Sequence, residues 1–261
     1  MLALSRRGIK LGYTPDVLTD AGEVCHISPR VPPSYGIPPL VADLSVLLAL
    51  MAGRNGRETT AVGQSGQVSR PLNPPYIFSR GHSLSIFKWP NFPWSPYAFC
   101  GPQLSTTSSF PVRKIGFLGF GRIAQATLAR LIPFGITHCL YTSNPNSPSK
   151  VDRDNAIARK YNLKLVKRVG IDDLAKESDI LFILAPGGEA TKHLVNEEFL
   201  KKMKRTSVIV NTSRGTVVDS DALAKALREG WIWAAGLDVI EGEPNVTIDH
   251  PLVKETRFVE K

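Results

Sequence analysis

The sequence predicts an α/β protein built on a doubly wound parallel sheet, and three observations support that fold. From Arg113 onward, short apolar stretches alternate with amphipathic stretches of helical periodicity. The apolar stretches are nearly continuous, as is typical of strands that are covered on both faces. The first of them runs into a glycine-rich turn, and a helical pattern follows that turn directly. This order of strand, turn and helix is the repeating unit of a parallel sheet.

The alternation assigns each element in order. We expect strands at residues 115–118, 138–142, 164–166, 180–185, 207–211 and 234–239, and helices at residues 123–131, 152–161, 171–175, 196–202 and 220–229. Ser220 is a suitable cap for the last helix, and Gly230 is suited to end it. The alternation of these six strands with five helices implies a parallel sheet that is covered on both faces.

The first part of the chain has a different character. Residues 8–20 and 41–66 read as pieces of a globular protein, and the second piece reads as one long helix. Residues 22–40 contain five prolines, and residues 68–88 contain three prolines, three cations and no acid. Neither of these two segments has helical or strand periodicity, so the sequence predicts loop or disorder in both.

Composition narrows the class of protein. The chain has 261 residues and a formal net charge of +9, but its basic residues are dispersed, so we expect no nucleic-acid partner. The apolar stretch at residues 41–52 is too short to span a bilayer and contains Asp43, so we expect no membrane segment. The three cysteines have no metal-ligand spacing, so we expect no metal site and a cytoplasmic, reducing location.

The turn Gly119-x-Gly121-x-x-Ala124 predicts a dinucleotide-binding site. Gly119 permits the tight turn, Gly121 lets the backbone approach a pyrophosphate, and Ala124 lets the helix pack on the strand. The start of the following helix offers unpaired backbone N–H donors, which attract phosphate together with the positive end of the helix dipole.

Further motifs follow at regular intervals and carry a resemblance to a known family. They are Gly12-Tyr-Thr-Pro-Asp-Val-Leu-Thr-Asp20, Val210-Asn-Thr-Ser-Arg-Gly215 with Val217-Val-Asp219, and Gly236-Leu-Asp-Val-Ile-Glu-Gly-Glu-Pro244 with His250-Pro-Leu. With these motifs the chain resembles the D-isomer-specific 2-hydroxyacid dehydrogenases, and among them the glyoxylate/hydroxypyruvate reductases. The resemblance covers residues 8–21, 41–67 and 89–253.

The resemblance implies an oxidoreductase that transfers a hydride from a nicotinamide cofactor to a small 2-oxo acid and yields a 2-hydroxy acid. Arg214 matches the family's substrate-binding arginine, and a guanidinium suits a planar carboxylate because it binds through two parallel hydrogen bonds. Glu243 matches the carboxylate that orients the catalytic histidine. Asp238 matches the acceptor for the nicotinamide carboxamide. Other cofactor contacts implied by the resemblance are the backbone at Arg122 and Ile123, the Ala185-Pro186 turn, Thr191 and Thr212.

The residues after the second strand determine whether NAD(H) or NADP(H) is preferred. NAD-selective sites place a carboxylate there to bind the ribose 2′-hydroxyl. The chain instead has Ser143 and Asn144, which can donate hydrogen bonds to a 2′-phosphate, with Lys150 or Arg153 as sources of positive charge. The sequence therefore favours NADP(H) over NAD(H). The Gly187-Gly188 pair departs from the Leu-Thr that the family usually has here and loosens that wall of the site.

The resemblance also sets the domain assignment. Residues 1–40 would be a remnant of the substrate domain with an irregular segment, 41–66 a crossover helix that helps form a homodimer, 67–110 an irregular region, 111–250 the dinucleotide-binding domain, and 251–261 a truncated tail. The family's catalytic histidine follows the Glu-Pro motif, and the chain contains no match to it, so we expect the chain to be inactive. The alternative is a catalytically dead NAD(P)-binding or scaffold protein.

The two irregular segments have two explanations. Deleting residues 22–40 or residues 68–88 restores the family's continuous run, and the flanking codons are compatible with splice sites. They are therefore either translated introns or genuine surface loops.

Overall fold

The structure, a computed structural model, describes residues 37–53, 112–148 and 150–254. Its strands are β1 (Lys114–Leu118), β2 (His138–Thr142), β3 (Leu165–Arg168), β4 (Ile180–Ile183), β5 (Val208–Asn211) and β6 (Ala234–Leu237). Its α-helices are α2 (Ile37–Gly53), α4 (Arg122–Leu131), α5 (Val151–Tyr161), α6 (Ile171–Glu177), α7 (Glu197–Lys202), α8 (Ser220–Glu229) and α9 (Pro251–Lys254). Short 3-10 turns lie at Ile132–Phe134, Glu189–Thr191 and Gly215–Val217.

The six strands form one parallel sheet in the order β3-β2-β1-β4-β5-β6. This order reverses direction between β1 and β4, and it is the doubly wound order of dinucleotide-binding domains. The fold class expected from the sequence is confirmed. Because all six strands are parallel, their carboxyl ends lie along the same edge of the sheet, where ligands bind in such folds.

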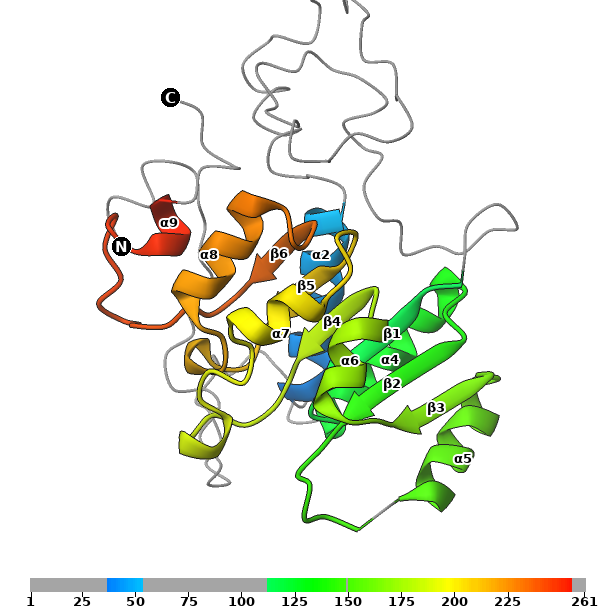
Figure 1. Ribbon diagram of the computed structural model, residues 1–261. Coiled ribbons are helices and arrows are strands. Elements are labelled where there is room, and N and C mark those ends of the chain that lie inside the picture. The colour runs from blue at the N-terminus through cyan, green and yellow to red at the C-terminus, as the bar shows by residue number, and fades with distance from the viewer. Residues whose placement is uncertain (1–36, 54–111, 149, 255–261) are drawn as a thin grey trace, which may run out of the picture.

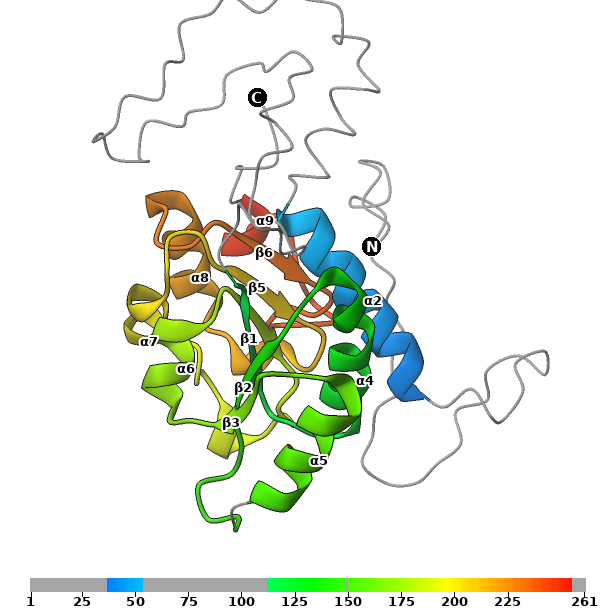
Figure 2. The ribbon, with the colours of Figure 1, turned by 90° about the vertical axis from the view of Figure 1, so that its right-hand side faces the viewer.

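Helices cover both faces of the sheet, as Figures 1 and 2 show. α2, α4 and α5 lie on one face, and α6, α7 and α8 lie on the other. Alternate residues of each central strand enter the two cores: in β4, Ile180 and Phe182 pack on the first face, while Leu181 and Ile183 pack on the second. All four are at most 1 % exposed. The continuous apolar sequence of the strand follows from burial on both faces.

Helix α2 comes from the N-terminal part of the chain and packs beside α4 (Figure 2). It also crosses the sheet at β6 so closely that a Cβ on Gly236 would lie 2.9 Å from the Leu48 backbone oxygen. The expected helix at 41–66 begins earlier, at Ile37, and residues 54–66 lie outside the described part. The expectation of irregular structure at residues 22–40 is therefore wrong for residues 37–40, which are helical. Pro38 and Pro39 fit the first helical turn, because a backbone N–H at these positions would have no acceptor within the helix.

The other boundaries agree with the sequence to within two residues, and one cap differs. Asp219 caps α8 in place of Ser220, because the Asp219 side chain accepts a hydrogen bond from the Ala222 N–H at 3.0 Å. Ser220 is the first helical residue. Gly230 ends the helix as expected, with a φ of 71°.

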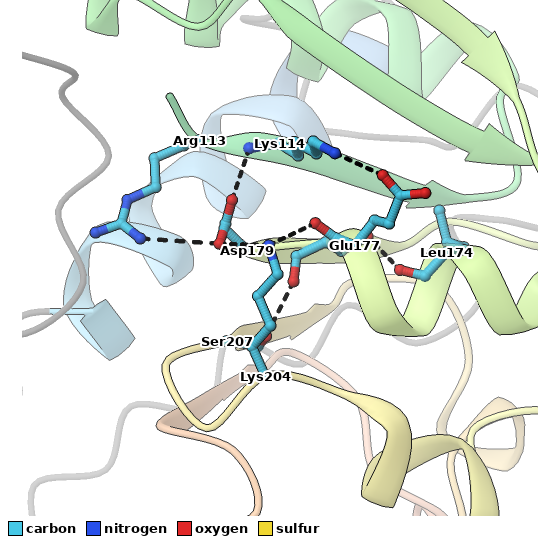
Figure 3. Close-up of polar contacts among 8 residues, drawn as sticks. Arg113, Lys114, Leu174, Glu177, Asp179, Lys204 and Ser207 are labelled. Atoms are coloured by element: carbon cyan, nitrogen blue, oxygen red, sulfur yellow. Dashed lines mark hydrogen bonds and ion pairs between the residues drawn. The ribbon is translucent and has the colours of Figure 1, made fainter. Parts of the chain in front are cut away.

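The amino-terminal edge of the sheet is held by a polar cluster around Asp179, drawn in Figure 3. The Asp179 carboxylate accepts hydrogen bonds from the Lys114 backbone N–H at 2.8 Å and from the Lys204 ammonium at 2.9 Å. Arg113 adds an ion pair at 3.8 Å. These contacts join β1, β4 and the approach to β5 at the edge opposite the glycine turn. Within the described ranges, no helix is both long enough and apolar enough to cross a membrane.

Candidate functional site

The glycine turn joins β1 to α4 and is shaped by two different constraints. Gly119 has a φ of 91°, and a Cβ there would lie 2.8 Å from the Ala185 backbone, so only glycine fits without movement. Its N–H donates to the Thr142 carbonyl at 3.0 Å, which ties the turn to β2. Gly121 is different, because a Cβ there would meet no heavy atom within 4 Å. The space in front of Gly121 is open.

The start of α4 fits the phosphates of a dinucleotide. Gly121 occupies the cap position, and no side chain caps the helix. The first turn contains no acidic residue, so the helix itself places no negative charge beside the backbone donors at Arg122 and Ile123. An uncapped helix start next to open space is the arrangement that binds pyrophosphate in this type of fold. The residues present therefore fit the cofactor that the sequence predicts.

Arg214 lies in the turn after β5 and is held by its neighbours. The buried Asn211 accepts a hydrogen bond from the Ser213 N–H and donates to the Arg214 carbonyl, at 3.1 and 3.0 Å. The Ser213 hydroxyl donates to the Ala185 carbonyl after β4. The stem of Arg214 fills the space beside Gly187, where a Cβ would lie 2.7 Å from the Arg214 Cγ. A side chain at position 187 would therefore require the Arg214 side chain to shift.

Two threonines assigned to the cofactor have their hydroxyls in protein contacts. Thr212 is 3 % exposed, and its hydroxyl lies 2.8 Å from the hydroxyl of Ser45 on α2. Thr191 donates toward the carbonyls of Pro186 and Gly188, at 2.7 and 3.1 Å. Thr212 can therefore meet a ligand through its backbone, while Thr191 stabilises the loop after β4 that contains Ala185 and Pro186.

The turn after β6 brings two of the assigned carboxylates together. Asp238 begins the turn, and its N–H donates to the Asn211 carbonyl at 2.9 Å. Burial raises the pKa of the Asp238 carboxyl, and the negative charge of Glu243 raises it further. Glu243 is exposed and accepts a hydrogen bond from the Ile240 N–H at 3.0 Å. A Cβ on Gly215 would collide with the Ile240 backbone, so the Arg214 turn and the carboxylate turn are packed directly together.

A histidine–carboxylate pair at this edge was missed by sequence reasoning. His193 follows the loop after β4, and its Nε2 lies 2.9 and 3.0 Å from the two carboxylate oxygens of Glu241. His193 has a φ of 49°, and its backbone N–H donates to the Thr216 carbonyl at 2.9 Å. The pair ties the loop after β4 to the turn that contains Asp238 and Glu243. The two residues are 48 positions apart, so no local pattern in the sequence indicates the contact.

The loop after β2 contains Ser143 and Asn144 and no carboxylate. The Asn144 side-chain oxygen accepts the Asn146 N–H at 2.9 Å, and the Ser143 hydroxyl lies 3.5 Å from that of Ser147. Of the two expected cations, Arg153 is engaged elsewhere: it pairs with Asp154 at 2.9 Å and lies 5.2 Å from the ring centres of Phe120 and Tyr141. Lys150 is exposed and precedes α5.

All the assigned site residues therefore follow the carboxyl ends of β1, β2, β4, β5 and β6, at one edge of the sheet. Comparisons with known proteins identify the family. The family described as "D-isomer specific 2-hydroxyacid dehydrogenase, NAD binding domain" matches residues 96–260. The chain belongs to this family. The matched range includes every assigned site residue.

Two curated relatives support the same family assignment. The chain is 34% identical over 254 residues to a glyoxylate reductase of Thermofilum pendens, covering 96% of this chain and 57% of the relative. It is 33% identical over 250 residues to the human glyoxylate reductase/hydroxypyruvate reductase, covering 96% and 58%. The chain thus spans a little over half the length of the curated relatives it matches.

Among solved structures, a Thermus thermophilus protein has a TM-score of 0.60 at 28% identity, covering 83% of this chain and 55% of that one. The NAD-dependent formate dehydrogenase of Staphylococcus aureus, solved in complex with NAD, has a TM-score of 0.61 at 26% identity, covering 84% and 54%.

Proposed function

We propose that the protein reduces a small 2-oxo acid of the glyoxylate or hydroxypyruvate class with a nicotinamide cofactor. The observation that carries the proposal is the packing of the Arg214 turn against the turn of Asp238 and Glu243, at the edge of the sheet where α4 presents its uncapped start. Relatives at 33–34% identity bear the names of such reductases, which supports the substrate class.

Each residue has a role that its position supports. The cofactor, when bound, supplies the hydride. Arg214, which is exposed in the turn after β5, binds the substrate carboxylate and polarises the neighbouring carbonyl. Asp238 orients the nicotinamide end by accepting a hydrogen bond from its carboxamide. Glu243 orients a histidine, which donates the proton to the developing alkoxide.

The proton donor decides between activity and binding alone. Within the described residues, the hydrogen-bond partner of Glu243 is the Ile240 N–H, and no imidazole is bonded to it. We therefore propose that these residues bind the cofactor and substrate carboxylate but catalyse slowly unless a histidine reaches Glu243. The second candidate, an NAD(P)-binding or scaffold protein without catalysis, is favoured by the same observation.

Three finer proposals concern cofactor, assembly and location. NADP(H) is preferred over NAD(H), because the loop after β2 has Ser143 and Asn144 where NAD-selective sites have an acid. The protein forms a homodimer through α2, as the resemblance implies. Its location is cytoplasmic, in keeping with three cysteines that have no pairing framework.

The test compares Arg214→Gln with the control Arg159→Gln, an exposed arginine on α5. Dinucleotide binding is measured by fluorescence, and reduction of glyoxylate and hydroxypyruvate by loss of NADPH absorbance. Removing Arg214 should lower kcat/KM by about 100- to 1,000-fold and leave the dinucleotide Kd unchanged, since one preorganised donor contributes that much. Binding of NADPH without measurable turnover of either acid in the unaltered chain supports the second candidate. Failure to bind either dinucleotide overturns both.

A further inference from the structure

Arg168 is the last residue of β3, and its guanidinium is held against the loop after β2. One terminal nitrogen donates to the Ser147 carbonyl at 2.8 Å. The other donates to the Asn144 carbonyl at 2.7 Å and approaches the Pro145 carbonyl at 3.4 Å. The arginine therefore contacts three backbone oxygens within residues 144–147, from a strand that follows this loop in the chain.

The loop is also closed by its own hydrogen bonds. The Ser147 N–H and hydroxyl both donate to the Asn144 carbonyl, at 2.9 and 2.8 Å. The Asn144 side-chain oxygen accepts the Asn146 N–H at 2.9 Å. The side-chain oxygen of Asn144 is thus hydrogen-bonded within the loop, and its NH2 group can donate to a ligand. The guanidinium is held by three carbonyl oxygens of one turn, and two of these contacts are exposed to solvent.

The charge of Arg168 is not neutralised within the described residues, where no ion pair joins it to a carboxylate. Arg153 differs, since it is paired with Asp154. Backbone carbonyls position Arg168 without cancelling its charge, and its five N–H donors exceed the three contacts that it makes. The end of the second strand therefore has a fixed positive charge, supplied by the third strand.

We propose that Arg168 is a specificity-determining residue, whose charge favours the 2′-phosphate of NADP(H) over the 2′-hydroxyl of NAD(H). The inference rests on the proposed function, because it assumes that a nicotinamide dinucleotide binds along the glycine turn. In folds of this type the adenosine ribose lies at the end of the second strand, and a nearby arginine accommodates the 2′-phosphate. Arg168 acts at this position through the loop that it holds, together with the hydroxyl of Ser143.

The test uses Arg168→Gln, which removes the charge, and Arg168→Lys, which keeps it. Arg159→Gln, on the exposed side of α5, is the matched control. The Kd of NADPH and of NADH is measured for each protein by fluorescence at low and high salt, with 2′,5′-ADP and AMP as competing probes. Thermal unfolding is followed in parallel.

Arg168→Gln should weaken NADPH binding about tenfold and change NADH binding less than about twofold, because one charge-assisted contact is lost. Arg168→Lys should retain most of the preference, and high salt should reduce the difference between the two dinucleotides. If Arg168→Gln fails to fold, the preference of the unaltered chain for 2′,5′-ADP over AMP, and its loss in high salt, tests the charge directly.

Equal weakening of both dinucleotides by Arg168→Gln overturns the inference and leaves Arg168 as a support for the loop. An unchanged Kd for NADPH, or a salt-independent preference, also overturns it. In these cases dinucleotide binding persists and the proposed function stands. Binding of neither dinucleotide by the unaltered chain overturns the proposed function, and the inference with it.

Discussion

At the scale of single residues, Gly119 and Gly121 are two positions apart but have opposite structural requirements. Gly119→Ala places a Cβ 2.8 Å from the Ala185 backbone at a φ of 91°, whereas Gly121→Ala enters open space. Gly119→Ala should lower the free energy of unfolding by about 2–4 kcal/mol, the combined effect of strain and overpacking. Gly121→Ala should leave stability nearly unchanged and raise the NADPH Kd at least about tenfold by obstructing the pyrophosphate. Urea unfolding and fluorescence titration check both, and normal NADPH binding by Gly121→Ala would contradict this placement of the phosphates.

Asp238 gives a prediction with a definite pH dependence. Burial, then the charge of Glu243, raises its pKa in the folded state above the unfolded value. Its contribution to stability is therefore fully present below the unfolded pKa of about 3.9 and is lost as the pH rises through the folded pKa. Asp238→Asn removes this loss, so the variant should gain stability relative to the unaltered chain at neutral pH, and the gain should shrink in acid. Urea midpoints on both sides of this window measure it, and a gain independent of pH would sink the explanation.

At the scale of elements, a buried hydroxyl pair joins α2 to the turn after β5. Ser45 is fully buried, donates to the Val41 carbonyl at 2.8 Å and lies 2.8 Å from the Thr212 hydroxyl. Ser45→Ala leaves the Thr212 hydroxyl buried without this partner and should destabilise by about 1–3 kcal/mol. Thr212→Val removes the unpaired group, so the double variant should lose less than the sum of the single ones. Urea unfolding of the four proteins measures the coupling, and additive losses would show that the pair has no energetic role.

The pair of His193 and Glu241 joins two loops of the site and predicts an effect on binding. Loss of the contact frees the turn of Asp238 from the loop after β4, so His193→Ala should raise the NADPH Kd about three- to tenfold. His193→Gln, whose amide can donate to Glu241, should restore part of the affinity. His138→Ala, at the opposite edge of the sheet, is the control. An identical effect of the His138 and His193 substitutions would indicate a general loss of stability.

At the scale of the whole molecule, the sequence predicts the sheet better than it predicts the contacts of the site. Apolar strands and the glycine turn are local patterns, so all six strands and their parallel arrangement could be predicted. The start of α2 at Ile37 could not be predicted, because the prolines that follow it usually indicate a loop. The Ser45–Thr212 contact joins residues 167 positions apart, and Arg168 reaches a loop that precedes it by more than twenty residues. Such contacts depend on how elements approach one another, which no local pattern encodes.

The exposed face of α2 predicts how two copies of the molecule would associate. Leu40, Leu47 and Met51 are 47%, 51% and 44% exposed, and their spacing of seven and four residues places them on one side of the helix. An apolar stripe of this kind suits a symmetric contact with a second copy, in which the same residues meet from both sides. Leu47→Glu would bury a charge in that contact and should raise the dimer dissociation constant at least about tenfold. Val151→Glu, at an apolar position 58% exposed on α5, is the matched control. Analytical ultracentrifugation of the three proteins across a concentration series measures the association. A dimer in the unaltered chain that Leu47→Glu dissociates and Val151→Glu does not would assign the interface to α2, whereas equal association of all three would place it elsewhere.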